Sequence, residues 1–144
     1  MEVEALEPPV VNSLLIADRV YRDVDSGKWV IAGVFNRLKT PALPARLDQL
    51  NVFFQLTNAT RSFDLWLRSE HAESGEVMFE MGGLMQVSPA DPLRVIEHLV
   101  RLQDVLFRRE GKYWIQLLSG EEILTQAPLY VQVVSSENTN SGSR

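Results

Sequence analysis

A Gly-x-Tyr step, Gly111-Lys112-Tyr113, constrains the fold of this chain more than any other feature. From this step onward, Tyr113, Ile115 and Leu117 alternate with other residues, as one side of a β-strand does. Immunoglobulin-like sandwiches use this pattern as a tyrosine corner, in which the Tyr hydroxyl bonds to the backbone a few residues upstream. The step therefore predicts an all-β, immunoglobulin-like antiparallel β-sandwich, with Gly111 and Tyr113 in structural roles. It predicts an architecture and carries no chemistry.

Much of the remaining chain also alternates between apolar and polar residues. In one such stretch, Val52, Phe54 and Leu56 fall on the same side of an extended segment. A period of two is typical of half-buried strands, and several such strands joined by polar turns indicate a sandwich. The residues predicted to form the core are Val52, Phe54, Leu56, Phe63, Leu65, Leu67, Phe79, Tyr113, Ile115, Leu117, Leu129 and Val131.

Turn residues stand where hairpins would need them. Asp25-Ser26-Gly27, Glu73-Ser74-Gly75 and Ser119-Gly120 each separate two predicted strands. Gly27 can adopt the positive φ that tight turns require, so it has a predicted structural role. Pro41 and Pro44 exclude a central strand between them, because proline cannot donate to a sheet ladder, and they predict a crossing between the two sheets.

One segment fits two kinds of structure. Asp91-Pro92 is a good start for a helix, with a capping carboxylate and proline at the first helical position. A sandwich, however, needs a strand directly before the tyrosine corner. The preferred interpretation is therefore a strand from about Val95 to Leu102, and a short helix between residues 91 and 106 is the alternative.

The length of 144 residues fits one domain with a substantial core. The first residues combine Pro8-Pro9 with acids, and the last ones are Ser, Asn and Gly with nothing apolar to bury. We expect a flexible N-terminal arm over residues 1–11, a β-sandwich domain over residues 12–134 and a disordered tail over residues 135–144.

Charge and cysteine content exclude several classes of function. A net charge of -5 argues against a general nucleic-acid binder, which needs a basic surface to displace counterions. The absence of cysteine excludes disulfides, zinc–thiolate sites and thiol nucleophiles. The N-terminus is acidic, unlike a signal peptide, and no apolar run is long enough to span a bilayer. The expected location is the cytoplasm, without membrane association.

Several segments together resemble a known family. They are Ala17-Asp18-Arg19-Val20, Asp25-Ser26-Gly27-Lys28, Ile31-Ala32-Gly33-Val34-Phe35, Phe107 with Gly111-Lys112-Tyr113, and Leu129-Tyr130-Val131. In these segments the chain resembles an uncharacterised bacterial family of single-domain proteins, a domain of unknown function. The resemblance implies an immunoglobulin-like β-sandwich and assigns no activity to any residue.

Two stretches contain possible metal ligands. Asp23-Val24-Asp25-Ser26-Gly27 begins like a calcium-binding loop, but the twelfth position is Val34, where an EF-hand needs a bidentate Glu. A hairpin turn explains this stretch better. His71 lies among Glu70, Glu73 and Glu76, a nitrogen-plus-carboxylate set that could hold a metal at the tip of a hairpin. We predict solvated charge there and no metal or cofactor.

Templates for enzymatic catalysis are missing. The chain has no Gly-x-Ser-x-Gly elbow, phosphate loop, dinucleotide fingerprint or His-Glu-x-x-His motif. Its other histidine, His98, lies on an apolar strand face, where a hydrogen-bonded histidine in the core or at an edge is the usual role. The sequence therefore predicts a protein that is not an enzyme and has no catalytic residues.

The tryptophans are the best candidates for a binding surface. Alternation places Trp66 with Arg68, and Trp114 with Lys112, on the polar side of their strands. Exposed indoles anchor protein partners or stack on sugars, because Trp provides a large contact area with little entropy loss. The alternative is that the segment from Gly82 to Pro92, or the ambiguous segment after it, folds over this side and covers both indoles.

These observations favour a non-enzymatic protein-interaction or structural module. Its partner would be an unidentified protein or a second copy of the chain, and sheet edges would allow a partner strand to be added. The first alternative is a carbohydrate or small-ligand binding module that uses Trp66 and Trp114. The weaker alternative is a metal-dependent enzyme at the His71 loop. Binding to nucleic acid or membranes is not expected.

Overall fold

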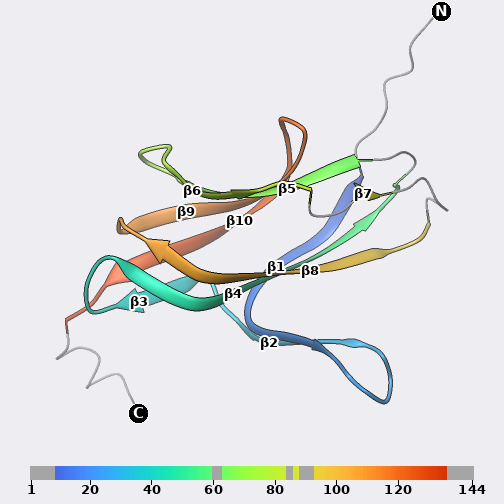
Figure 1. Cartoon of the computed structure of the whole chain (residues 1–144), viewed down its shortest axis with the longest axis horizontal. Coiled ribbons are helices and arrows are strands. Elements are labelled where there is room, and N and C mark those ends of the chain that lie inside the picture. The colour runs from blue at the N-terminus through green and yellow to red at the C-terminus, as the bar shows by residue number, and fades with distance from the viewer. Residues whose placement is uncertain (1–8, 60–62, 84–85, 88–92, 136–144) are drawn as a thin grey trace, which may run out of the picture.

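The computed structural model describes residues 9–59, 63–83, 86–87 and 93–135, and these form two β-sheets that face each other (Figure 1). The described residues contain no helix, and so none that could cross a membrane. The strands are β1 (Val10–Arg22), β2 (Trp29–Val34), β3 (Arg37–Thr40), β4 (Ala45–Thr57), β5 (Phe63–His71), β6 (Val77–Met81), β7 (Gln86–Val87), β8 (Ile96–Phe107), β9 (Gly111–Ser119) and β10 (Glu122–Val133).

The order of the strands is that of an immunoglobulin-like sandwich. One sheet has the order β2-β1-β4-β8, and the other has the order β3-β10-β9-β5-β6, with β7 also pairing with β5. If β1 is taken as strand A, then β4 and β8 take the places of B and E, and β5, β9 and β10 those of C, F and G. The pair β3–β10 is parallel, whereas the other described pairs are antiparallel. The predicted fold class is confirmed.

The core lies between the two sheets. Every predicted core residue whose side chain the structure describes belongs to it, with Phe79 only partly buried. The predicted core lacks the contributions of β1 and β8, two further residues of β4, and Ala59, which follows β4. The added residues are Ile16, Ala45, Leu50, Ala59, Val100, Leu102, Val105 and Phe107.

Tyr113 makes the contact that a tyrosine corner requires. Its ring is fully buried, and its hydroxyl donates a hydrogen bond of 2.7 Å to the carbonyl of Arg109. The amide N–H of Arg109 donates to the same hydroxyl at 3.3 Å. Burial raises the pKa of Tyr113 above its usual value, with a smaller opposing effect from the bond to Arg109. Gly111 has a φ of 121°, and a Cβ there would lie 3.0 Å from Nε2 of His71, so glycine is required before the corner.

The segment before the corner is a strand. β8 pairs with β4 from Ile96 opposite Leu56 to Phe107 opposite Ala45, so it extends beyond the predicted end at Leu102. The alternative of a helix is wrong for residues 93–106, because the ladder with β4 takes the backbone hydrogen bonds that a helix would need. Residues 91 and 92 lie outside the described part of the chain.

β8 bends in its last third at Asp104, which has a φ of 55°. Before the bend Leu102 points into the core, and after it Val105 does, so the inward side changes from even to odd positions. Alternation alone cannot follow such a change. Asp104 forms an ion pair of 2.6 Å with Arg46 of the neighbouring strand β4, and both side chains are largely exposed.

The turns and the sheet crossing follow the prediction. Residues 23–28, 72–76 and 120–121 connect β1 to β2, β5 to β6 and β9 to β10. The segment 41–44 leads from β3 in one sheet to β4 in the other. Val10 and Val11, which the prediction assigned to a flexible arm, pair with Thr57 and Leu56 because the first strand begins at Val10. Residues 1–8 and 136–144 lie outside the described residues.

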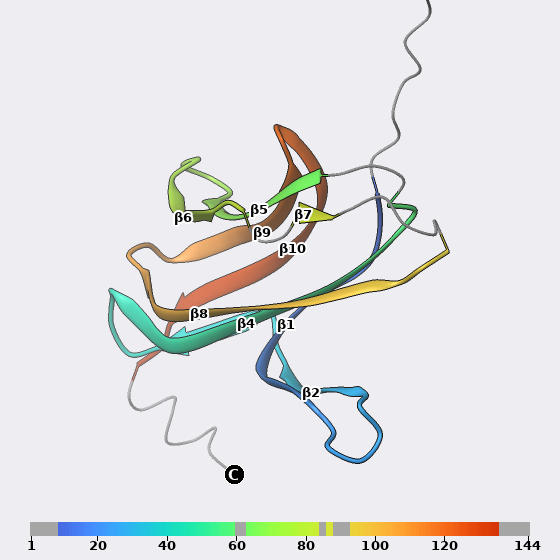
Figure 2. The ribbon, with the colours of Figure 1, turned by 45° about the vertical axis from the view of Figure 1, so that its right-hand side comes forward.

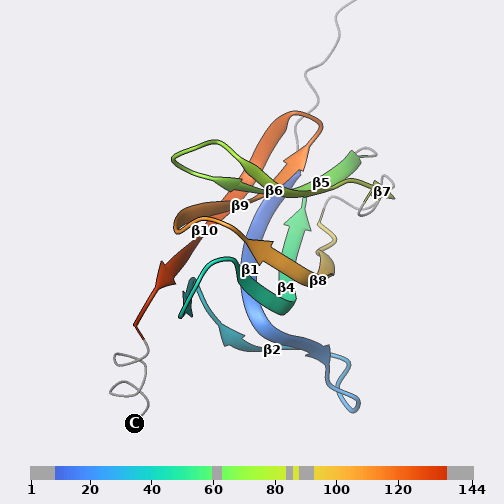
Figure 3. The same ribbon diagram turned by 60° about the vertical axis from the view of Figure 1, so that its left-hand side comes forward.

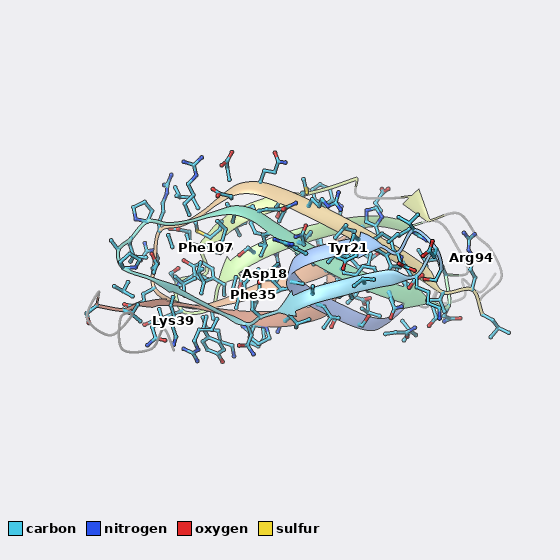
Figure 4. All side chains as sticks on the ribbon, turned by 90° about the horizontal axis from the view of Figure 1, so that it is seen from below. Asp18, Tyr21, Phe35, Lys39, Arg94 and Phe107 are labelled. Carbon is cyan, nitrogen blue, oxygen red and sulfur yellow. The ribbon has the colours of Figure 1, made fainter. Side chains whose placement is uncertain are left out.

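A two-stranded extension distinguishes the first sheet. β1 pairs with β4 only as far as Ala17, and from there onward it pairs with β2 alone. We call residues 18–34 the β1–β2 arm; Figures 2 and 3 show it projecting from the lower side of the sandwich. In Figure 4, β2 is in front, with Asp18 and Tyr21 of the arm near the centre of the view.

Candidate interaction surfaces

Trp66 and Trp114 lie on the outer face of the sheet that contains β9, as alternation predicts. In the strand register, Trp66 of β5 is opposite Leu118 of β9, and Glu70 of β5 is opposite Trp114. Trp66 is 37% exposed and Trp114 is half-buried. We call this outer side of β3, β10, β9 and β5 the tryptophan face.

A polar row divides this face into two patches. Nε of Arg68 donates to Oε1 of Gln116 at 2.8 Å, and Nε2 of Gln116 donates to Oε1 of Gln126 at 3.0 Å. The row lies between the two tryptophans, whose positions differ by four residues along β9, or about 13 Å. The indoles therefore form two separate patches and no continuous platform.

The patch around Trp66 is partly covered. A Cβ at Gly82 would lie 2.5 Å from carbons of the Trp66 indole, so the Gly82 backbone packs directly against this ring. A hollow of about 420 Å³ remains beside it, bordered by Arg68, Glu80 and Leu118. Of the segment that was predicted as a possible cover, Gly82 does cover part of Trp66. Residues 84–85 and 88–92 of that segment are outside the described chain.

The patch around Trp114 combines aromatic rings with cations from three strands. Nζ of Lys112 lies 3.9 Å from the centre of the Trp114 ring and 5.9 Å from that of Tyr130. The guanidinium of Arg37 lies 5.1 Å from the Tyr130 ring. We call Arg37, Lys112, Trp114 and Tyr130 the cation–aromatic patch. Arg37 and Tyr130 were not predicted as part of this surface, because only the parallel pairing of β3 with β10 brings them together.

The cations of this patch have no acidic partner in the described part of the chain. The ion pairs found there are Arg46–Asp104, Arg68–Glu70 and Arg109–Glu76. Arg37 donates instead to Oε1 of Gln132 at 3.0 Å. Lys39, labelled in Figure 4, is exposed on β3 two positions after Arg37 and so points to the same side. A chain with a net charge of -5 therefore carries a locally positive patch.

His71 is buried, and both of its ring nitrogens are hydrogen-bonded, one within its hairpin and one to the turn between β8 and β9. Its exposed fraction is 4%, Nδ1 accepts from the amide of Ser74 at 3.1 Å, and Nε2 lies 2.9 Å from the carbonyl of Glu110. This arrangement fits the neutral tautomer with hydrogen on Nε2, which leaves no lone pair for a metal. Glu70 and Glu76 pair with arginines, and the described residues contain no group of three metal-ligating side chains.

The Asp23 stretch is a closed turn. Oδ2 of Asp23 accepts from the amide and the hydroxyl of Ser26 at 2.9 and 2.7 Å, and these bonds lower the pKa of Asp23. Gly27 has a φ of 71° and donates from its amide to the Asp23 carbonyl at 2.8 Å. The hairpin interpretation explains these contacts, including the predicted role of Gly27.

His98 lies on the inner side of β8. Its ring centre is 5.5 Å from that of Phe54, and burial lowers its pKa below the usual value. It therefore packs as an aromatic ring at the margin of the core.

A cleft opens between the last strands of the two sheets, β6 and β8. It has a volume of about 410 Å³, and its lining includes Met78, Phe79, Leu102 and Val105. Leu102 and Val105 are each 8% exposed, whereas the core residues of β4 in the middle of the sheet are at 0%. The core residues beside this cleft are thus more accessible to solvent than those of β4.

By its fold and its surface, the protein is an immunoglobulin-like sandwich that carries a cation–aromatic patch. Residues 12–132 match the model of a family of unknown function (DUF6941), and the chain belongs to this family. This confirms the resemblance to such a family found in the sequence. No curated protein matches the sequence.

Two solved structures resemble the chain. One is the Pseudomonas fluorescens alkylpurine DNA glycosylase AlkC bound to DNA containing an abasic site analog, with a TM-score of 0.54 and 13% identity. That match covers 90% of this chain and 32% of the glycosylase, so the chain spans a minor part of that protein. The other is an immunoglobulin-like protein from Pseudomonas aeruginosa, with a TM-score of 0.45, 11% identity, and 90% and 100% of the two chains covered. At such identities the likeness to AlkC shows the fold alone.

Proposed function

We propose that the protein is a non-enzymatic interaction module that binds an acidic segment of a partner protein through the cation–aromatic patch. The observation that carries the proposal is the position of Lys112 over the rings of Trp114 and Tyr130, with Arg37 over Tyr130 as well. Neither cation pairs with an acid among the described residues.

The chemistry of the patch suits carboxylates next to apolar groups. Charged hydrogen bonds from Arg and Lys to a carboxylate are stronger than neutral ones, and Arg37 offers a planar fork that matches a carboxylate. Trp114 and Tyr130 supply apolar area at a small entropic cost, which is why such residues dominate binding energies at interfaces. A flat sheet face suits a protein surface better than a small molecule.

The overall charge supports an orienting role for this patch. A chain of net charge -5 repels an acidic partner as a whole, whereas Arg37, Lys39 and Lys112 together attract it locally. Complementary charge of this kind fixes the docking orientation and speeds encounter more than it adds affinity.

Two other ligands use similar side chains. Single-stranded nucleic acid stacks on aromatic residues beside cations, and the similar glycosylase is bound to DNA, but the acidic balance of this chain disfavours a phosphate backbone. A sugar would need a free face of an indole. Lys112 already covers one face of the Trp114 ring. Trp66 is therefore the better candidate on this sheet for stacking against a sugar.

The test is fluorescence anisotropy with a labelled polyglutamate peptide, a polylysine peptide and an oligothymidylate, at low and high salt. We expect polyglutamate to bind and the double variant Arg37→Glu/Lys112→Glu to bind at least tenfold more weakly, a loss of about 1.4 kcal/mol or more. The matched control is Arg19→Glu/Arg94→Glu, which makes the same charge change at exposed sites away from the patch.

The outcomes separate the proposals. An equal loss in both double variants would mean that only net charge matters, and the patch assignment would be wrong. If the oligothymidylate binds more tightly than polyglutamate, the patch is a nucleic-acid binding surface and the proposal is wrong. If no probe binds the unaltered protein, the patch has no role in recognising acidic partners.

A further inference from the structure

The β1–β2 arm extends from the sheet β2-β1-β4-β8 and packs on the outer face of that same sheet, on the side of the sandwich opposite to the tryptophan face. In the arm, Val20 and Ile31 are opposite each other in the register, and both pack in a cluster with Phe53 of β4 and Leu99 of β8. Phe53 is only 2% exposed although it points out of the sandwich. The arm therefore builds a second, smaller core on the outside of this sheet.

Side chains of the sheet hold the backbone of the arm. Nδ2 of Asn51 donates to the carbonyl of Asp18 at 2.8 Å, and Arg101 donates to the carbonyl of Val20 at 3.0 Å. A Cβ at position 33 would lie 2.5 Å from Oδ2 of Asp18, and Gly33 has a φ of 73°, so the base of the arm requires glycine. These contacts fix the distance between arm and sheet.

A groove of about 500 Å³ remains between the arm and the sheet, and we call it the arm groove. This volume is in the range of small-molecule sites. The arm contributes Gly27, Lys28, Trp29 and Ile31, and the sheet contributes Ser13, Leu15, Phe53, Gln55 and Glu97. Four of the lining side chains are aromatic or aliphatic, and four are polar or charged, so the groove combines apolar area with polar groups that can orient a ligand.

A hydrogen-bonded row crosses the sheet side of the groove. Oγ of Ser13 donates to Oε1 of Gln55 at 2.9 Å, and Nε2 of Gln55 donates to Oε2 of Glu97 at 2.8 Å. The row ends on a carboxylate, which retains capacity to accept from a ligand. Lys28 balances the charge of Glu97, so the lining as a whole is neutral.

Trp29 forms the aromatic wall and is held in place from two directions. Its ring lies 5.2 Å from that of Phe53 at an interplanar angle of 57°, and the guanidinium of Arg22 lies 4.4 Å from the ring centre. Its Nε1 is buried and has no hydrogen-bond partner in the described structure. Native proteins leave few such donors unpaired.

We infer that the arm groove binds a small, uncharged aromatic molecule that carries a hydroxyl group. The ring would lie against Trp29 and Phe53, and the hydroxyl hydrogen would be donated to Glu97. The arm groove lies on the sheet β2-β1-β4-β8, whereas the cation–aromatic patch lies on the sheet that contains β9, and the two sites bind different classes of ligand. The two proposals can therefore be tested independently.

The test follows the indole N–H signals of the tryptophans in the nitrogen-15 labelled full chain, with 1-naphthol as the probe. Trp29→Phe, Trp66→Phe and Trp114→Phe assign the signals. We expect the Trp29 signal to shift saturably while those of Trp66 and Trp114 stay in place. 1-Naphthoate, which has the same rings and a carboxylate, should bind at least tenfold more weakly because Glu97 repels it, a difference of about 1.4 kcal/mol.

Two variants sharpen the result. Glu97→Gln should bring the two probes closer in affinity, whereas Glu80→Gln, the matched change beside Trp66, should leave their difference unchanged. Ser13→Trp should fill the groove and abolish the shift of the Trp29 signal. The inference is overturned if naphthol leaves the Trp29 signal unmoved up to its solubility limit, if all three indoles shift alike, or if Glu97→Gln has no effect on the preference.

Discussion

The two outer faces of this sandwich follow the same alternation and reach opposite results. On the tryptophan face, Trp66 keeps 37% of its surface exposed and Trp114 is half-buried beside Lys112. On the opposite face, Phe53 also points outward, yet the β1–β2 arm covers it to 2%. Alternation therefore identifies the side of a sheet on which a residue lies, and a separate piece of chain decides whether solvent reaches it.

The largest expected effect tests the covered face. Phe53→Ala should lower the free energy of unfolding by about 3–5 kcal/mol, because it empties a buried site that the arm closes. Urea denaturation of the variant measures this loss. A loss below about 1 kcal/mol would show that the arm leaves Phe53 open to solvent, and the two faces would then be alike.

The next effect tests the core that both faces share. Tyr113→Phe should cost about 1–3 kcal/mol, since it removes a buried hydroxyl and leaves the Arg109 carbonyl without its donor. The raised pKa of Tyr113 also predicts that stability falls as the pH rises from about 10 through the pKa of the folded state, because the unfolded chain loses this proton first. Urea unfolding at neutral and alkaline pH should show both effects, and unchanged stability in both conditions would contradict the role of the corner.

A smaller effect is expected on the tryptophan face. Trp66→Ser and Trp114→Ser should each cost about 1 kcal/mol, because part of each ring packs on Gly82 or Lys112 while the rest is exposed. The same urea series as for Phe53→Ala allows a direct comparison. Losses as large as that of Phe53→Ala would mean that both faces are covered.

The smallest effect concerns His98, at the margin between the core and the outer surface. Burial lowers its pKa, so the unfolded chain takes up this proton first as the pH falls below about 6.5, and stability decreases. Because the ring is only half-buried, we expect less than about 1 kcal/mol between neutral pH and about pH 5.5. His98→Gln should reduce this pH dependence, and an identical pH profile in the variant would assign the loss to other groups.

Local patterns were enough to predict the fold class. The corner at Tyr113 and the turn at Gly27 depend on contacts within a few residues, and both are found where the sequence indicates. Alternation alone did not decide between strand and helix for β8, and the strand was predicted because a tyrosine corner follows a strand. Its bend at Asp104 remained hidden, since a change of the inward side breaks the period on which the prediction rests.

Long-range pairing explains what the sequence could not reveal. Arg37 meets Tyr130 only because β3 joins β10 in parallel, across most of the chain length. The arm groove combines β1, β2, β4 and β8, and no local pattern reports that β1 changes its partner at Ala17. No local pattern therefore distinguishes Trp29 as Trp66 and Trp114 are distinguished, although it lines the larger of the two hollows beside a tryptophan.

The bend at Asp104 has a consequence for how copies of this protein behave at high concentration. An outermost strand of 12 residues offers its backbone as a template on which a second molecule can extend the sheet into a fibril. Such stacking needs a straight, flat ladder, and β8 is interrupted where Asp104 turns to a φ of 55° and presents its charge beside Arg46. The same bend that keeps Leu102 and Val105 in the core thus protects the chain from aggregation along its open edge.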